Sequence, residues 1–383
     1  MRVLVIGHTY MTRFAQAKYE ALTRLYPDVS VTGLVPRRLE KEIIDRVAEE
    51  RWDDRLRFIA LPTALPGWGS RYFFTSPRVV SILREFHPDV VQIEHEPVAL
   101  VLLQLNAVFA ALRQSPKTVL FSWEDIAARR NPVLHVIARS IERLNVPRLA
   151  YAIAGNDDAV GILRSKGYRG PITLLPQFGI DPDVFRPGEE PALRRRLGLG
   201  GSFVIGFAGR IVREKGLLTL TRALLDMPER DWKLLLVGRG DLMPQIEGMF
   251  ASAGLGDSLR HIDSVLFPEL PQYYRCMDAF VLPSETTPHW KEQFGHVLPE
   301  AMSCGVPVIA SSSGFIPRVV GDAGLIFPEG DEAALGRSLA RVMDEPGLRG
   351  ELVEKGHRCI AERYSHEALA RQIYKIYSEV THG

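Results

Sequence analysis

Residues 204–216 have the sequence Val204-Ile205-Gly206-Phe207-Ala208-Gly209-Arg210-Ile211-Val212-Arg213-Glu214-Lys215-Gly216. The first four residues predict a short buried strand, and residues 217–225 predict a helix after the glycine-containing turn. Strand, turn and helix in this order form the repeating unit of a parallel α/β sheet. The same alternation continues in both directions along the chain, so the sequence predicts the α/β fold class.

Short apolar runs alternate with helix-length segments through most of the chain. We expect buried strands at residues 3–6, 29–34, 56–59, 90–93, 119–121, 152–154, 172–175, 204–207, 234–237, 279–282, 308–310 and 325–327. The segment 176–188 interrupts this pattern with Pro176, Gly179, Pro182, Pro187 and Gly188, and such a density of proline and glycine favours a linker.

This organisation predicts two Rossmann-like, doubly wound domains that face a central cleft. The boundaries that we expect are 1–182 for the N-terminal domain and 183–364 for the C-terminal domain. A helix at 365–383 could cross back to the N-terminal domain. Open α/β sheets bind ligands at the carboxyl ends of their strands, so residues that follow the strands are the first candidates for a site.

The composition excludes several classes of protein. Of the 383 residues, 46% are hydrophobic and 24% are charged, as in ordinary globular proteins. No apolar run approaches the roughly 20 residues of a membrane-spanning helix, and the first apolar run is too short for a signal peptide, so we expect a cytoplasmic protein. The net charge of +1 argues against nucleic-acid binding. Cys276, Cys304 and Cys359 lie too far apart in sequence to suggest a disulfide framework or a zinc site.

The segment 101–150 is more basic than the rest of the chain, with seven basic and three acidic residues. Its arginines include Arg129, Arg130, Arg139, Arg143 and Arg148. They fit a solvated helix face, or else a weak site for an anionic acceptor or a lipid surface. Weak peripheral contact with a membrane through the N-terminal domain therefore remains open.

The most informative stretch for chemistry is Glu292-Gln293-Phe294-Gly295-His296-Val297-Leu298-Pro299-Glu300, between an expected strand and an expected helix. Gly295 lets the backbone approach a ligand closely, and the N–H groups after it point outward at the positive end of the helix dipole. This arrangement predicts a seat for an anion such as a diphosphate. Glu292 and Glu300 could reach different hydroxyl groups of one ligand, although two glutamates on a solvated surface are an equally open reading.

The turn at 206–216 is a second candidate. Arg210 and Lys215 follow the end of an expected strand and could neutralise a leaving diphosphate as its charge develops. The alternative is that both are ordinary basic surface residues. The sequence lacks the Gly-x-x-x-x-Gly-Lys-Ser/Thr string of a P-loop, and Gly238-Arg239-Gly240 lacks the third glycine of a dinucleotide fingerprint, so we expect a simple loop there.

Taken together, these segments resemble the retaining glycosyltransferases of family 4, which have the GT-B fold. The resemblance rests on Gly209-Arg210 with Lys215-Gly216, on Glu292-x-Phe294-Gly295 with Glu300, and on Ala301-Met302 followed by Gly305-Val306-Pro307-Val308. It also includes Pro176–Asp181, Met277–Ser284, Gly321–Gly324 and Tyr364–Tyr377. It is good over roughly residues 150–380 and loose over the first half of the chain.

The resemblance implies a sugar-nucleotide-dependent transferase that retains the anomeric configuration and needs no metal. UDP- or GDP-linked sugars are then the expected donors, with no further cofactor, and the C-terminal domain would bind them. The implied donor-site residues are Gly209, Arg210, Lys215, Val265, Leu266, Glu292, Phe294, Gly295, His296, Val297, Leu298 and Glu300.

The resemblance also implies individual roles for these residues. Arg210 and Lys215 would hold the diphosphate, Glu292 the donor sugar and Glu300 the ribose. We take Glu292, Arg210, Lys215 and Glu124 as catalytic candidates. We assume no nucleophile, because the departing diphosphate can accept the proton of the acceptor hydroxyl on the same face. Asp181-Pro182-Asp183 lies in the linker, and we expect no metal site there.

The first half departs from the family pattern at the positions where an acceptor site is expected. The loop after the first strand contains Gly7-His8-Thr9-Tyr10 instead of two glycines. The family histidine after strand 119–121 is replaced by Ser122-Trp123-Glu124-Asp125, and any of the last three could take its place. Glu124 could steady positive charge at the reacting carbon, or Glu124 or Asp125 could cap the next helix. The expected acceptor-binding residues are His8, Tyr10, His95 and Asp125, although His95 could equally be a structural residue paired with a neighbouring acid.

The sequence therefore predicts a hexosyltransferase that acts on a hydroxyl of a glycan, a glycolipid or a small molecule. A sugar-nucleotide epimerase on the same scaffold is a second hypothesis. A catalytically silent partner subunit that binds nucleotide is a third, although the complete set of Arg210, Lys215, Glu292 and Glu300 argues against it.

Overall fold

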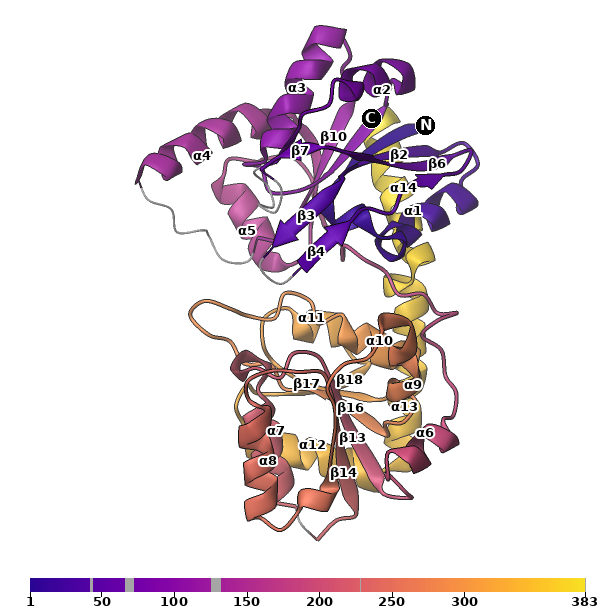
Figure 1. The fold of residues 1–383 in the computed structure, drawn as a ribbon, viewed down its shortest axis with the longest axis vertical. Helices are drawn as coiled ribbons and strands as arrows, with labels where there is room; N and C mark the ends of the chain where they lie inside the picture. The colour runs from indigo at the N-terminus through magenta and orange to yellow at the C-terminus, as the bar shows by residue number, and fades with distance from the viewer. Residues whose placement is uncertain (42–43, 66–71, 125–131, 228, 383) are drawn as a thin grey trace. The chain divides into compact units, whose positions relative to one another are not determined.

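The computed structural model describes residues 1–41, 44–65, 72–124, 132–227 and 229–382. The chain forms two compact units, shown in Figure 1. Unit 1 contains Met1–Gly179 and His366–Gly383, and unit 2 contains Ile180–Ser365. The chain therefore leaves unit 1 once and returns to it with its last helix.

Within the described residues, unit 1 is built on an eight-stranded sheet with the strand order β12-β11-β10-β9-β1-β2-β6-β5. All neighbouring strands are parallel except β5 and β6. The strands are β1 (Arg2–Ile6), β2 (Ser30–Pro36), β5 (Arg51–Trp52), β6 (Leu56–Leu61), β9 (Val90–Glu94), β10 (Lys117–Ser122), β11 (Leu149–Ala154) and β12 (Ile172–Leu174). The direction of winding reverses between β1 and β9, which places the topological switch point of this sheet there.

Helices cover both faces of this sheet, because successive side chains of a strand point to opposite faces. Val3 and Val5 join one buried cluster, and Leu4 and Ile6 join the other. The helices of unit 1 are α1 (Arg13–Leu25), α2 (Arg78–Phe86), α3 (Leu100–Leu112), α4 (Pro132–Asn145), α5 (Asp157–Ser165) and α14 (His366–His382), with short 3₁₀ turns at His8–Met11 and Val146–Arg148.

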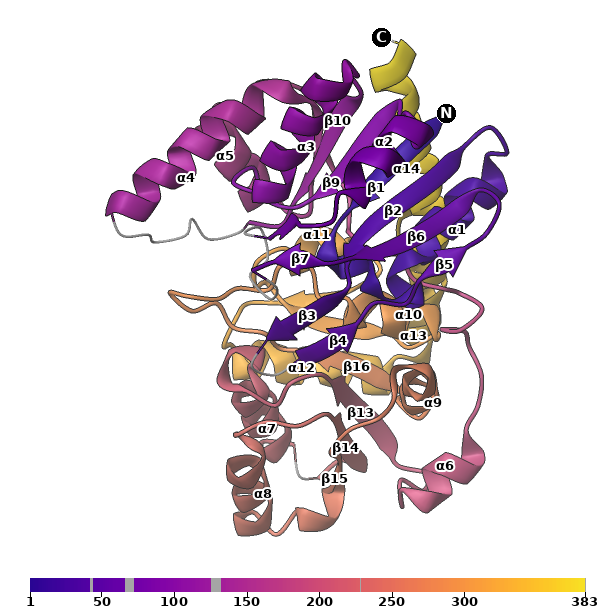
Figure 2. The same cartoon turned by 45° about the horizontal axis from the view of Figure 1, so that its top comes forward.

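The last helix, α14, belongs to unit 1 through its contacts with α1. Both views show the two helices side by side (Figures 1 and 2), and the rings of Tyr26 and Tyr374 stack with their centroids 3.6 Å apart. The Tyr377 hydroxyl donates to the side chain of Gln92 on β9 at 3.2 Å. The C-terminal segment thus completes one face of the first sheet.

Unit 2 contains a six-stranded parallel sheet with the order β15-β14-β13-β16-β17-β18. Its strands are β13 (Phe203–Ala208), β14 (Trp232–Val237), β15 (Leu259–Ile262), β16 (Ala279–Leu282), β17 (Val308–Ser311) and β18 (Gly324–Phe327). Renumbered from one, this is the order 3-2-1-4-5-6 of a doubly wound sheet, with the switch point between β13 and β16.

The helices of unit 2 follow its strands in alternation. They are α6 (Pro191–Arg196), α7 (Leu217–Leu225), α8 (Met243–Ser252), α9 (Leu270–Tyr274), α10 (Val297–Ser303), α11 (Ile316–Val320), α12 (Glu332–Asp344) and α13 (Pro346–Cys359), with 3₁₀ turns at Arg213–Lys215, Gly256–Ser258 and Phe267–Glu269 and a π-helical turn at Ile360–Tyr364. The prediction of two doubly wound, parallel α/β units is confirmed. No described helix combines the length and the apolar character needed to cross a membrane.

Two small antiparallel pairs were not predicted. Strand β3 (Arg38–Lys41) pairs with β4 (Ile44–Val47), and β7 (Thr63–Ala64) pairs with β8 (Phe73–Phe74). Both pairs are inserted between β2 and α2, so they decorate the N-terminal sheet without changing its winding.

Candidate functional site

The switch point of unit 2 brings together the two segments that the sequence singled out. Lys215 follows β13 and Glu292 follows β16, and these strands are neighbours in the sheet. The loops after β13 and β14 approach so closely that a Cβ atom on Gly238 would lie 1.9 Å from the carbonyl oxygen of Gly209. Glycine is therefore required at this edge of the sheet.

Lys215 and Glu292 form a nearly buried ion pair. The Lys215 Nζ atom lies 2.5 Å from Glu292 Oε2, and the two side chains are 15% and 9% exposed. Ser284, which is fully buried, donates its hydroxyl to the same carboxylate oxygen at 2.8 Å. The Lys215 ammonium also lies 4.8 Å from the centre of the Trp290 ring, within range of a cation–π contact.

The backbone of Glu292 is fixed by the turn before α11. Phe315 donates its N–H to the Glu292 carbonyl oxygen at 3.0 Å. Gly314 has φ 52°, and a Cβ atom there would lie 2.1 Å from that same oxygen. On the other side, Gly295 has φ 74° and leaves no room for a side chain beside Leu282. The backbone of Glu292 is thus fixed by this hydrogen bond and by the close turn at Gly314.

Glu300 lies inside α10 and belongs to a separate buried contact. It accepts a hydrogen bond from the Tyr274 hydroxyl at 2.7 Å. Burial raises the pKa of Glu300 to about 7, and the Tyr274 hydrogen bond partly opposes this. Burial also lowers the pKa of His296, just before α10, to about 4.

Arg210 and the 265–266 segment lie more openly than the ion pair. The Arg210 side chain is 63% exposed and is 3.5 Å from Glu214, one helical turn further along the chain. Leu266 is 70% exposed. The structure therefore brings Lys215 and Glu292 together and places Glu300 on the helix that follows. Arg210 lies apart from them, with its side chain largely exposed to solvent.

The switch point of unit 1 carries two stacked histidines. His8 follows β1 and His95 follows β9, and their rings stack with centroids 5.1 Å apart. The His95 Nε2 atom is 2.9 Å from the Tyr72 hydroxyl, so its hydrogen-bond partner is a tyrosine rather than the neighbouring acid that the sequence left open. Burial and the charge of His8 hold the pKa of His95 well below its usual value.

Acidic side chains gather after strands β9 and β10 of unit 1. Glu96 accepts hydrogen bonds from the Ser122 hydroxyl at 2.5 Å and from the Trp123 N–H at 3.1 Å. Burial and the nearby charge of Glu124 raise the pKa of Glu96 to about 7. Glu124 pairs with Lys166, whose ammonium is also 3.3 Å from Glu142. Three carboxylates therefore surround one lysine.

Two expected acceptor residues are not found at this surface. Tyr10 is fully buried, and its hydroxyl is 3.5 Å from that of Tyr19 inside the core, so it presents nothing to a ligand. Asp125 lies outside the described residues. The next described helix, α4, begins at Pro132, too far along the chain for Glu124 to cap it. Among the described residues, no group of three or more histidine, cysteine or acidic side chains could hold a metal ion.

Sequence reasoning missed four residues that shape the donor side of the site: Tyr274, Ser284, Trp290 and Gly314. Ser284 lies in a segment that the family resemblance included, but no role followed from it. Trp290 is two residues from Glu292, and a lysine facing an aromatic ring cannot be read from spacing. Tyr274 contacts Glu300, and Gly314 lies against the carbonyl oxygen of Glu292. Both are distant from these glutamates in sequence, so the fold alone brings them together.

Comparison with known proteins finds a family match in the C-terminal half of the chain. Residues 189–361 match the family of glycosyl transferases group 1. A D-inositol 3-phosphate glycosyltransferase from Arthrobacter sp. (strain FB24) is 33% identical over 183 residues, 45% of this chain and 42% of that protein. A 2-deoxystreptamine glucosyltransferase from Streptomyces kanamyceticus is 28% identical over 300 residues, 74% of this chain and 76% of that protein. The chain thus spans less than half of the first relative and about three quarters of the second.

Solved structures extend the similarity of fold to the whole chain. HepE from Anabaena, in complex with UDP, has a TM-score of 0.71 and 16% sequence identity, and the match covers 99% of this chain and all of that one. At this identity the likeness concerns the fold, which is the two-sheet GT-B arrangement expected from the sequence.

Proposed function

We propose that the chain, whose residues 189–361 match the family of glycosyl transferases group 1, is a retaining, metal-independent hexosyltransferase that uses a nucleotide-diphosphate sugar. The observation that carries this proposal is the Lys215–Glu292 pair at the switch point of unit 2, held at 2.5 Å between glycine-rich turns. We further take unit 2 as the donor-binding domain and unit 1 as the acceptor-binding domain.

Lys215 supplies positive charge where a diphosphate would leave. Its ammonium has three donors, and Glu292 occupies only one direction around it. Arg210, exposed and paired with Glu214, can turn toward the same oxygens. Preorganised cations stabilise charge that develops in the transition state without reorganising at that moment. In this proposal the diphosphate takes the acceptor's proton, and the chain supplies position and charge.

The two glutamates divide the recognition of the donor. Glu292, anchored through its backbone and through Ser284, would accept hydrogen bonds from sugar hydroxyls. Glu300, whose pKa burial raises to about 7, would accept from or donate to the ribose hydroxyls according to its protonation. HepE binds UDP, and we propose a UDP-sugar as the first donor to test.

The acceptor that we propose is a small polyhydroxylated ring. The names of both relatives specify a cyclitol, D-inositol 3-phosphate in one and 2-deoxystreptamine in the other. Near the strand ends of unit 1, Glu96 and Glu124, together with Glu142 on α4, outnumber the single cation Lys166. That excess of negative charge favours an amino-substituted ring over a phosphorylated one. The stacked pair His8 and His95 lies at the same edge of the sheet and would contact ring hydroxyls.

A cytoplasmic location with peripheral contact to an anionic membrane completes the proposal. The outer helix α4 exposes five apolar side chains: Val133 (69% exposed), Leu134 (44%), Val136 (64%), Ile137 (50%) and Leu144 (48%). Val133, Ile137 and Leu144 recur at helical spacing and form one stripe. Val136 borders this stripe, and Arg143 and Arg139 follow on the side of Val136. Vesicles with phosphatidylglycerol should retain the protein, and Val136→Glu should release it. Dimerisation of the protein without binding to such vesicles would contradict this membrane contact.

The central experiment is a thermal-shift panel of UDP-, GDP-, ADP- and TDP-sugars on the full chain, because a specific ligand raises the apparent stability. The donor that binds is then incubated with 2-deoxystreptamine or D-inositol 3-phosphate, and the products are analysed by NMR. Transfer with retention of the anomeric configuration supports the proposal. Conversion of the donor without an acceptor would instead indicate an epimerase.

Two variants connect the activity to the site. Lys215→Met should abolish most transfer, whereas Lys355→Met, a lysine on the surface helix α13 of the same unit, should leave transfer unchanged. Equal activity in both variants would remove Lys215 from the mechanism. Absence of transfer and of donor hydrolysis across the whole panel would favour a silent partner subunit.

A further inference from the structure

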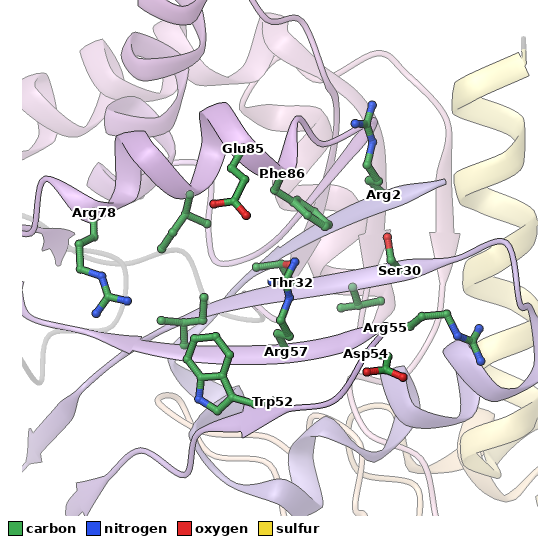
Figure 3. Close-up of a pocket in the computed structure, with 13 residues that line it drawn as sticks. Arg2, Ser30, Thr32, Trp52, Asp54, Arg55, Arg57, Arg78, Glu85 and Phe86 are labelled. Carbon is green, nitrogen blue, oxygen red and sulfur yellow. The ribbon is translucent and has the colours of Figure 1, made fainter.

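A second pocket lies in unit 1, at the opposite edge of its sheet from His8 and His95. It has a volume of about 500 Å³, within the range of roughly 300–1,000 Å³ that is usual for small-molecule sites (Figure 3). Arg2 and Ser30 line it, and they are the first residues of β1 and β2. The strand ends that carry the candidate acceptor residues are therefore about 13 Å away along β1.

The floor of the pocket is a row of side chains across three neighbouring strands. Trp52 on β5 pairs with Arg57 on β6, and Arg57 pairs with Thr32 on β2. Paired residues of neighbouring strands project from the same face of a sheet, so these three side chains lie next to one another. Figure 3 shows Arg57 and Thr32 near the centre of the pocket and Trp52 beside them.

The opposite wall comes from helix α2. Arg78, Ile82 and Glu85 recur at intervals of four and three residues and therefore share one face of the helix. Val79, Leu83 and Phe86 are the buried residues of α2 and anchor it to the sheet. The pocket is thus bounded by two regular elements, which hold its charged groups in place.

Four guanidinium groups and two carboxylates line this pocket: Arg2, Arg55, Arg57, Arg78, Asp54 and Glu85. Two of the arginines already have partners, since Arg2 pairs with Asp89 at 3.3 Å and Arg55 donates to the Thr23 carbonyl oxygen at 2.6 Å. Among the described residues, Arg57 and Arg78 form no ion pair. Two cations are therefore available to an incoming anion.

Two further features indicate more than a simple anion site. Thr32 is 1% exposed, and its buried hydroxyl oxygen has no hydrogen-bond partner among the described residues. A buried polar group without a partner costs stability, so a ligand hydroxyl there would be favourable. Trp52 is 57% exposed and offers a large flat apolar surface beside the charges.

We propose that this pocket binds a phosphorylated monosaccharide, with the phosphate on Arg57 and Arg78 and the sugar ring against Trp52. Guanidinium groups match phosphate oxygens with two parallel hydrogen bonds. Asp54 and Glu85 at the walls accept hydrogen bonds from sugar hydroxyls, and the indole covers the apolar face of the ring. The site is separate from the proposed donor and acceptor sites and does not depend on the proposed transferase activity.

The test is isothermal titration of the full chain with glucose 6-phosphate, glucose and inorganic phosphate at low ionic strength. Glucose 6-phosphate should bind at least 10-fold more tightly than either of the other two. Arg78→Gln should weaken that binding at least 10-fold, and Trp52→Ala should weaken binding of glucose 6-phosphate without affecting phosphate. Lys215→Met should bind glucose 6-phosphate like the unaltered chain, which separates this pocket from the donor site.

Arg84→Gln is the matched control, because Arg84 is exposed on the same helix as Arg78 but does not line the pocket. It should bind like the unaltered chain. Equal loss in Arg84→Gln and Arg78→Gln would overturn the proposal, as would equal affinity for phosphate and glucose 6-phosphate or no measurable binding. Because Arg78 is exposed on a helix, its variant should fold even if Arg57→Gln on β6 does not.

Discussion

Removing one or both members of the Lys215–Glu292 pair separates the stability of the donor site from its chemistry. Breaking a buried ion pair by removing one partner costs about 3–5 kcal/mol, because the other charge stays buried without compensation. At roughly 2–4 °C per kcal/mol for a unit of this size, Lys215→Met and Glu292→Gln should each lower the unfolding midpoint of unit 2 by about 6–20 °C. The double variant leaves neither charge uncompensated, so it should be more stable than the sum of the single losses predicts, by about 2 kcal/mol.

Activity should behave differently. Loss of one preorganised charged group from a transition-state site costs about 100- to 1,000-fold in rate, and the double variant should recover none of it. The measurements are differential scanning fluorimetry, urea unfolding and a transfer assay with the donor that the thermal-shift panel identifies. Strictly additive stability losses would show that the two side chains do not interact in solution. Recovery of transfer in the double variant would refute their proposed role.

Three further predictions concern the same unit. Burial raises the pKa of Glu300 from 4.5 to about 7, so the folded chain binds this proton more tightly than the unfolded chain does. The resulting stabilisation is complete below about pH 4.5 and is lost as the pH rises through about 7. Glu300→Gln should therefore remove this part of the pH dependence of the unfolding midpoint between pH 5 and 8. Gly314→Ala places a Cβ atom 2.1 Å from the Glu292 carbonyl oxygen at φ 52°. It should lower the free energy of unfolding in urea by at least about 1–3 kcal/mol and reduce transfer. Gly347→Ala, where a Cβ atom meets nothing, should change neither quantity. Transfer should be unchanged after dialysis against EDTA, and activity restored only by an added divalent cation would contradict the metal-independent mechanism.

The sequence predicted the sheets well because parallel strands are buried on both faces and appear as short apolar runs. The expected strand at 279–282 coincides with β16, and the expected helix at 217–225 coincides with α7. The unpredicted strands lack this signal. Strand β3 has the sequence Arg38-Leu39-Glu40-Lys41, and β15 contains Arg260 and His261 among its four residues. Their pairing depends on neighbours that are distant in sequence.

The sequence singled out the charged residues of the candidate site but not the residues that hold them in place. Lys215 and Glu292 follow strands, and their side of the sheet could be anticipated from that alone. Their contact could not, because it requires β13 and β16 to be neighbours, which is a property of the strand order. Tyr10 shows the opposite failure, since it follows the first strand as an acceptor residue would, but its ring fills the core. Position after a strand indicates an edge of the sheet and does not indicate which way a side chain turns.

The return of α14 to unit 1 has a consequence for how the chain folds during synthesis. The entry and exit of unit 2 lie side by side, since the Ile180 N–H donates to the Tyr364 carbonyl oxygen at 2.7 Å, so unit 2 is in effect an insertion within unit 1. While the ribosome is making residues 180–365, the face of α1 that meets Tyr374 is still uncovered. All the strands of unit 2 are synthesised before the last helix of unit 1. Unit 2 can therefore complete its folding before unit 1 does.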